Sequence, residues 1–201
     1  SRRIPAERMM YLNANANQDI DGDGTNDVDA LPSLAAIEYA ITNWAFGADK
    51  LDVFLIGDSD EDGQFIIDVT NVLSAAVLDD LVDQFQTIDR PAYVVLEFDG
   101  SGGYVPALSN APAERIVVAS TEPGVEAMRD ADGLVSFEQY FMAAIFNSYS
   151  IGEAFDVARL AVRRSSGELS QEAQIDDDLD GIANGKNDGD VADHRYFGAA
   201  L

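Results

Sequence analysis

The stretch VVLEFDGSGGYVP (94–106) decides the fold, because an apolar run passes directly into a glycine-rich bend with Asp99 at the corner. Extended by two residues, the run reads AYVVLEF (92–98), which is typical of a strand buried on both faces of a sheet. A second run, LDVFLIG at 51–57, ends in the same way at Asp58. If these strands are neighbours, Asp58 and Asp99 face each other at the carboxyl edge of the sheet, where α/β proteins bind ligands.

Other apolar patterns predict the remaining strands and the helices between them. We expect strands at 8–12 (RMMYL) and 115–120 (RIVVAS), and a short accessory strand at 64–68. Helices are expected at 31–47, with Leu34, Ile37, Ile41 and Trp44 on one face, at 75–85 behind Ser74, at 137–149 behind Ser136, and from Ser150 toward Gly167. Gln139 and Glu153 complete capping boxes with the last two serines. The alternation predicts a three-layer α/β/α fold with a mostly parallel sheet, in one domain spanning residues 1–201.

Charge and composition narrow the classes of partner. The formal net charge of −25 argues against nucleic acid and anionic membranes and favours cations. The sequence has no Cys, which excludes disulfides, zinc-thiolate sites and thiol catalysis. No apolar run reaches the roughly 18 residues of a membrane helix, so we expect no membrane insertion. Of the 26 Asp residues, 14 lie in three short loops, and this clustering favours metal binding over adaptation to high salt.

The first acidic loop, DIDGDGTNDVD at 19–29, carries the Asp-x-Asp-x-Asp-Gly half of a calcium-binding loop. Ala30 stands where such loops place a bidentate Glu, so Asp27 or Asp29 would have to close the coordination shell. A solvated acidic turn is the alternative. The predicted ligands of this insertion are Asp19, Asp21, Asp23, Thr25, Asp27 and Asp29.

Two further loops repeat the pattern. In the acidic C-terminal segment, 174–201, the predicted calcium ligands are Asp176, Asp178 and Asp180, and Asp188 substitutes for the missing Glu because position 12 is Asn187. A flexible acidic segment is the alternative there. The loop DSDEDG (58–63) has the same skeleton, with Asp58, Asp60 and Asp62 as candidate ligands, but an apolar run follows and a tight hairpin turn is equally compatible.

At Asp58 and Asp99 the chain resembles the legumain-like branch of the caspase, legumain and gingipain clan of cysteine peptidases. In that clan one strand ends in His-Gly and the next in a motif like Asp-Ala-Cys-x-Ser-Gly. Here VFLIGDSDEDGQF places Asp58 at the His, and LEFDGSGGYVP places Asp99 at the Cys. The likeness continues in ERIVVASTEPGVEA, in GLVSFEQYFMAAIFNSYSIGEAFDVAR and in IDDDLDGIANGKNDGD, and thus covers nearly the whole chain from Ile4.

The resemblance implies a caspase-like fold without peptidase activity. Both signature residues are replaced by aspartates, and the one His in the sequence, His194, lies far away and is expected at the surface or packed in the tail. Ser101 has no His placed to activate it. Family members also begin with an earlier strand and helix that have no counterpart here. This departure predicts that another protein chain, or a cleaved upstream portion, adds a strand to the sheet.

Several functions are compatible with these patterns. The leading hypothesis is a non-catalytic, calcium-stabilised structural or binding module of an extracellular or cell-surface prokaryotic protein, in a polymer or filament. One alternative is a hydrolase that uses an Asp58/Asp99 dyad, or a metal ion bound by these two residues. The other is a pseudo-enzyme that still binds peptides in the cleft that is catalytic in active family members. For the two aspartates themselves, the alternatives to catalysis are that they cap neighbouring turns or receive backbone N–H bonds, or that they share a cation.

Overall fold

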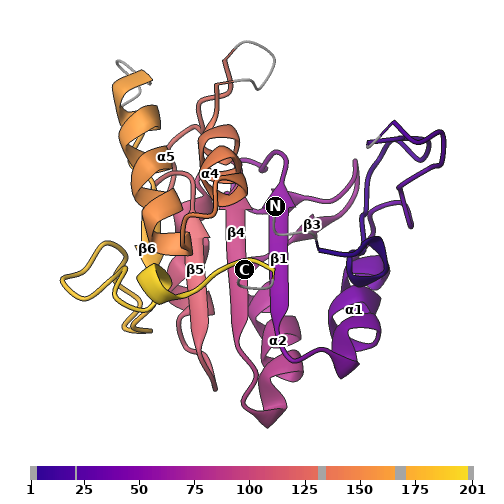
Figure 1. Ribbon diagram of the computed structural model, residues 1–201, viewed down its shortest axis with the longest axis horizontal. Helices are drawn as coiled ribbons and strands as arrows, with labels where there is room; N and C mark the ends of the chain where they lie inside the picture. Colours follow the sequence, from indigo (N-terminus) through magenta and orange to yellow (C-terminus); the bar gives the residue numbers. More distant parts are fainter. Residues whose placement is uncertain (1–3, 21, 131–134, 166–170, 199–201) are drawn as a thin grey trace.

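The computed structural model describes residues 4–20, 22–130, 135–165 and 171–198. They form a mixed α/β fold around a four-stranded sheet in the order β1-β4-β5-β6 (Figure 1). Strands β1 (Leu51–Ile56), β4 (Ala92–Glu97) and β5 (Arg115–Ala119) run parallel, and β6 (Gln174–Asp176) pairs antiparallel with β5. The mostly parallel sheet predicted from the alternation of strands and helices is therefore present.

Strand β4 lies at the centre of the molecule and all six of its residues are buried. Because successive side chains of a strand point to opposite faces, the side chains of β4 pack into two separate apolar cores, one on each face of the sheet. Val94 and Leu96 pack in one apolar cluster, and Tyr93 and Val95 in the other. Burial on both faces explains the uninterrupted apolar run in the sequence.

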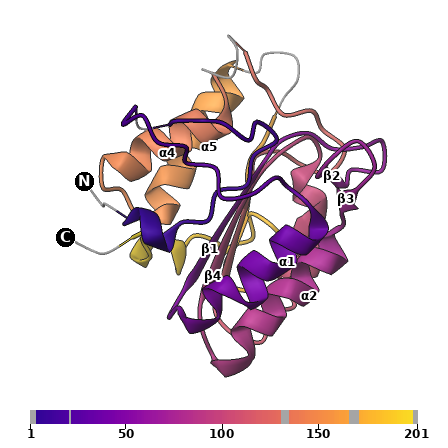
Figure 2. The ribbon, with the colours of Figure 1, turned by 90° about the vertical axis from the view of Figure 1, so that its right-hand side faces the viewer.

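Helices cover both faces of the sheet (Figure 2). The face of Val94 carries α1 (Leu34–Thr42), α2 (Ala75–Phe85) and α3 (Val105–Leu108). Helix α1 ends at Thr42, before the predicted end at 47, and a 3₁₀ turn follows. Of the predicted apolar face only Ile37 and Ile41 are buried, while Leu34 on α1 and Trp44 in the 3₁₀ turn are 41% and 40% exposed. The hydroxyls of Ser33 and Ser74 accept hydrogen bonds from the first turns of α1 and α2, so the predicted start of α2 is confirmed.

The opposite face carries α4 (Phe137–Phe146) and α5 (Ile151–Ser165). Ser150 and Glu153 form both bonds of the predicted capping box at the start of α5. Helix α4 ends three residues before its predicted end at 149, because Ser148 takes a left-handed conformation with φ of 71°. The predicted end of α5 near Gly167 lies outside the described residues.

Short elements complete the fold. The accessory strand expected at 64–68 is present as β2, and it pairs antiparallel with β3. The short elements are η1 (Ala6–Arg8), η2 (Trp44–Gly47), β2 (Phe65–Ile66), β3 (Val72–Leu73), η3 (Gln86–Ile88), η4 (Ser101–Tyr104) and η6 (Ala192–His194). Across the described ranges, every helix is too short or too polar to cross a membrane.

The strand expected at 8–12 is wrong. Only an isolated bridge from Leu12 to Ala30 forms, and the backbone around it pairs with Asp29 and Ala30 at the end of the first acidic loop. Met9 is 51% exposed, so the apolar run does not enter the core as a unit. The local pattern was compatible with a strand, but the pairing partner lies within the same N-terminal segment and not in the sheet.

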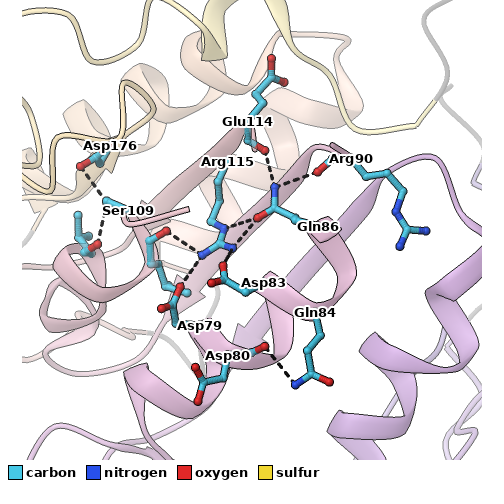
Figure 3. A network of polar contacts seen from close by, with 12 residues as sticks. Asp79, Asp80, Asp83, Gln84, Gln86, Arg90, Ser109, Glu114, Arg115 and Asp176 are labelled. Carbon is cyan, nitrogen blue, oxygen red and sulfur yellow. Dashed lines mark hydrogen bonds and ion pairs between the residues drawn. The ribbon is translucent and has the colours of Figure 1, made fainter. Parts of the chain in front are cut away.

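Arg115, the first residue of β5, is fully buried and uses its guanidinium to join three elements (Figure 3). It donates to the carboxylates of Asp79 and Asp83 on α2, at 2.7 and 2.6 Å, and to the carbonyl oxygen of Leu108 on α3 at 2.8 Å. The side-chain oxygen of Gln86 accepts two further bonds from it. In turn, the Gln86 amide donates to backbone carbonyls just before β4 and β5.

Replacing Arg115 by Met is expected to lower the free energy of unfolding by about 3 kcal/mol, because removal of one partner leaves buried acceptors without donors. Chemical denaturation measures this change. The matched control is Arg159→Met, which removes a half-exposed ion pair with Glu172 and should cost under about 1 kcal/mol. Equal losses in the two variants would contradict a structural role for the buried guanidinium.

Candidate metal centre

Three carboxylates come together in the loop that follows β6. Asp176, Asp178 and Asp188 each place one oxygen within 4.8 Å of the other two, so the group could hold a metal ion. Asp176 is completely buried, Asp188 is half-buried and Asp178 is exposed. The structure thus brings together three of the four ligands predicted in this segment. Asp180 is the fourth, and it accepts the backbone N–H of Ile182.

The turn that carries these residues is ordered by its own carboxylates. Asp176, at position 1 of the loop, accepts the N–H of Gly181, at position 6, at 2.8 Å. Gly181 needs a left-handed conformation, with φ of 78°, to make this turn. Asp178 accepts the N–H of Asp180. The glycine turn at position 6 is the turn that a calcium-binding loop makes.

The loop is attached to the core through Asp176 and Asp177. The hydroxyl of Ser109, at the end of α3, donates to Asp176 at 2.9 Å, and Figure 3 shows this bond beside the Arg115 network. Asp177 accepts the N–H groups of Gly189 and Ala192, which closes the loop behind the cluster. The cluster therefore belongs to the folded body of the protein.

Charge in the cluster is incompletely compensated by the described residues. Burial, with smaller contributions from Asp176 and Asp178, raises the pKa of Asp188 to about 6. Burial also raises the pKa of Asp177. Carboxylates that are close and partly desolvated favour either a bound proton or a bound cation. A cation would relieve the repulsion of all three ligands at once.

The first acidic loop adopts the same turn without assembling a comparable cluster among the described residues. Asp19 accepts the N–H of Gly24, again from position 1 to position 6, and Asp23 accepts the N–H of Thr25. Asp27 and Asp29 accept backbone N–H groups of Ile20 and Tyr11. The predicted ligand Asp21 lies outside the described residues, so the set of six remains a prediction.

The loop 58–63 is a hairpin turn into β2. Asp60 accepts the N–H groups of Asp62 and Gln64, Gly63 takes a φ of 75°, and Ser59 forms an antiparallel bridge with Phe65. Within the residues that the structure places, Asp58, Asp60 and Asp62 do not form a three-carboxylate group. The geometry matches the turn that the sequence left open as an alternative.

Asp58 and Asp99 follow neighbouring parallel strands, since Ile56 of β1 is level with Glu97 of β4. Both carboxylates contact one short segment, residues 125–130, which we call the 125–130 strap. The Asp99 carboxylate accepts the N–H of Ala127 at 2.8 Å, and Asp58 forms an ion pair with Arg129 at 2.7 Å. Arg129 also donates to the carbonyl oxygen of Gly57. Asp99 thus receives a backbone N–H bond, which was one alternative for the two aspartates, whereas Asp58 is held by an arginine from a distant part of the chain.

Glu97 is a notable residue of this edge that sequence reasoning missed. Its side chain is 1% exposed, and neither carboxylate oxygen has a partner at good hydrogen-bond geometry, although the Glu138 N–H and the Ser120 hydroxyl contribute weakly. The Nε of Arg129 and the hydroxyl of Thr121 are likewise buried without a partner among the described residues. Burial raises the pKa of Glu97 to about 7, although the charge of Arg129 acts in the opposite direction. The signal was one acidic residue in an otherwise apolar strand.

The nucleophile and imidazole of a thiol or serine hydrolase are not brought together among the described residues. Ser101 is buried, and its hydroxyl lies 3.3 Å from the hydroxyl of Ser120. His194 is exposed in η6, as expected for a surface residue. No cysteine is present in the sequence. A nucleophile within reach of an imidazole, which thiol and serine hydrolases require, is therefore absent among the described residues.

Comparison with protein-family models and with curated proteins finds no match for this chain.

The buried carboxyl of Glu97 predicts a specific pH dependence. Its folded pKa of about 7 lies above the ordinary value of 4.5, so the native state holds the proton more tightly than the unfolded state. Its contribution to stability is present below about pH 4.5 and is lost as the pH rises to about 7. The loss is on the order of 3 kcal/mol.

The comparison of wild type with Glu97→Gln, by denaturation between pH 5 and pH 8, isolates this effect from the other carboxylates. The variant is expected to gain stability relative to wild type as the pH increases, because it carries no charge. A difference between the two proteins that stays constant over this range would show that Glu97 ionises normally.

Proposed function

We propose that this protein is a non-catalytic, calcium-stabilised module that serves a structural or binding role at the cell surface or outside the cell. The observation that carries the proposal is the cluster of Asp176, Asp178 and Asp188 on a turn attached to the core by Ser109. Binding of an ion to this site would stabilise the native state by mass action, because the unfolded chain lacks the assembled ligands.

Calcium fits the donor set better than other common metal ions. All three side chains offer carboxylate oxygens, and the pattern Asp-x-Asp-x-Asp-Gly with a left-handed glycine at position 6 is that of calcium loops. Zinc and copper favour nitrogen or sulfur ligands, which this cluster does not provide. Loops of incomplete pattern bind calcium with dissociation constants of roughly 10⁻⁴ to 10⁻³ M, which suits extracellular calcium concentrations.

We further infer that the module is a degenerate member of the legumain-like branch of the caspase, legumain and gingipain clan. Support comes from the parallel strands β1, β4 and β5 with helices on both faces, and from the aspartates that follow β1 and β4. In this proposal Asp58 and Asp99 replace the catalytic His and Cys. Their carboxylates hold the 125–130 strap over the edge instead of performing chemistry.

A module of this kind acts through other protein chains, either by self-assembly into a polymer or by accepting a strand. The strongly acidic composition supports protein and cation partners over nucleic acid. No separate observation favours the alternative hydrolase, since Asp58 is bound to Arg129 and Asp99 to a backbone N–H.

Calcium at 10 mM is expected to raise the melting temperature by a few degrees over the value in a chelator, since a ten- to hundredfold excess over the dissociation constant contributes about 1.5 to 3 kcal/mol. Asp188→Asn should lose most of this increase, because it removes one ligand charge. Asp80→Asn, at an exposed position on α2, is the matched control and should keep it. Scanning calorimetry measures the melting temperature of all three proteins with calcium and with the chelator. An increase of equal size in both variants would place the ion elsewhere.

The proposal also predicts catalytic inertness. Wild type and Asp99→Asn are expected to release no product from panels of fluorogenic peptides and esters, because the part of the chain that the structure describes contains no nucleophile next to an imidazole. The assay is run with and without calcium to exclude a requirement for the ion. A turnover in wild type that Asp99→Asn abolishes would support the Asp58/Asp99 hydrolase instead.

A further inference from the structure

Strand β1 ends the sheet on one side without a neighbour. Its six residues pair with β4 in continuous parallel register, and within the described ranges no strand pairs with its other side. Figure 2 looks onto this side of the molecule, with α1 and α2 covering one face of the sheet and α4 and α5 the other, and with the N-terminal segment, in indigo, crossing in front of part of the sheet edge. Strand β1 is as long as the central strand β4, although it lies at the edge of the sheet.

The outward backbone groups of β1 can be identified from its bonds to β4. The N–H groups of Leu51 and Gly57 donate to carbonyl oxygens at the two ends of β4. Because backbone groups alternate in direction along a strand, those of Asp52, Phe54 and Ile56 point away from β4. Among the described residues, none of these three N–H groups has a hydrogen-bond partner.

This edge carries few of the features that protect edge strands. Proline and bulges, which are common protections, do not occur between Leu51 and Ile56, and Asp52 is the single charged residue of the strand. Val53 packs against the apolar cluster of one face and Phe54 against that of the other, where its ring lies 5.0 Å from that of Phe197. An added strand would therefore meet apolar side chains on both of its faces.

Asp52 gives the edge a preference for a partner with a positively charged side chain. One of its carboxylate oxygens pairs with Lys50 at 2.9 Å, while the other is buried and has no hydrogen-bond partner. Burial raises the pKa of this carboxyl. In a sheet, a residue directly opposite on an added strand would place its Cβ about 5 Å from that of Asp52. A lysine or arginine there would supply the missing donor.

We propose that the outer edge of β1 binds an extended segment of a different polypeptide, which adds a fifth strand to the sheet and places a basic side chain beside Asp52. The inference rests on the proposed function as a module that acts through other chains, and it names the site and the chemistry of the partner. A second copy of this chain is disfavoured, because two bodies of charge −25 repel each other and a second β1 offers no basic residue within the strand.

Defined peptides test the proposal in 150 mM salt. The probe is a fluorescein-labelled peptide of alternating valine and threonine with one lysine near its start. One control replaces the lysine by glutamate. A second control keeps the lysine and replaces alternate valines by proline, so that the charge is retained but the peptide cannot form a strand. Fluorescence anisotropy should show saturable binding of the probe and affinities at least about tenfold lower for both controls.

Two variants of the protein locate the contact. Ile56→Pro removes an outward N–H without removing a bond to β4 and should abolish binding, whereas Ile56→Thr keeps the N–H and should bind normally. Asp52→Asn should weaken binding of the lysine probe. The ratio of this variant's affinities for the lysine probe and the glutamate control should be close to one. Circular dichroism verifies that each variant is folded.

Hydrogen exchange of the unmodified protein gives a readout that needs no variant. Addition of the probe should slow exchange at Asp52, Phe54 and Ile56 and leave Val53 and Leu55 unchanged, because the latter two already bond to β4. Absence of saturable probe binding, or unchanged binding by Ile56→Pro, would overturn the proposal. Self-association in sedimentation experiments that Ile56→Pro abolishes would assign the edge to a second copy. Neither result would alter the calcium-dependent melting, which tests the proposed function separately.

Discussion

The buried guanidinium of Arg115 is the interaction on which the rest of the structure depends. It lies at the amino end of β5 and joins that strand to α2 and α3, while Gln86 extends the same network to the backbone before β4. An uncompensated charge at this depth would be strongly destabilising, so these elements must meet in one arrangement. With the amino ends of the strands aligned, the parallel register brings their carboxyl ends level at Glu97, Asp58 and Asp99.

Several of the cationic side chains are used inside the protein or in ion pairs with its own carboxylates. Arg90 donates to backbone carbonyl oxygens under α2, Arg129 holds the strap, and Arg195 pairs with Glu114. In the loops at 19–29 and 176–190, Asp19 and Asp176 accept backbone N–H groups at the first position of the turn. This distribution explains how a chain of charge −25 can be folded and still present oxygen ligands to a metal ion.

The sequence predicted the elements whose signal is local. The bounds of α2 and the cap of α5 followed from serine positions, and β1, β4 and β5 followed from continuous apolar runs. Features that depend on distant partners were missed. Residues 8–12 pair with the end of their own loop, β6 is only three residues long, and the burial of Glu97 beside Arg129 joins positions far apart in the chain. In the metal centre, residue spacing indicated the ligands, but only the fold shows that Asp188 reaches Asp176.

The bond between Ser109 and Asp176 joins residues 67 positions apart. During synthesis the chain emerges from its amino end, so β5 and α3 leave the ribosome well before β6. Until then β5 has an open edge and Ser109 lacks its acceptor. During translation the partly formed sheet therefore has two unpaired edges. One of them closes when β6, which carries the acidic turn, pairs with β5.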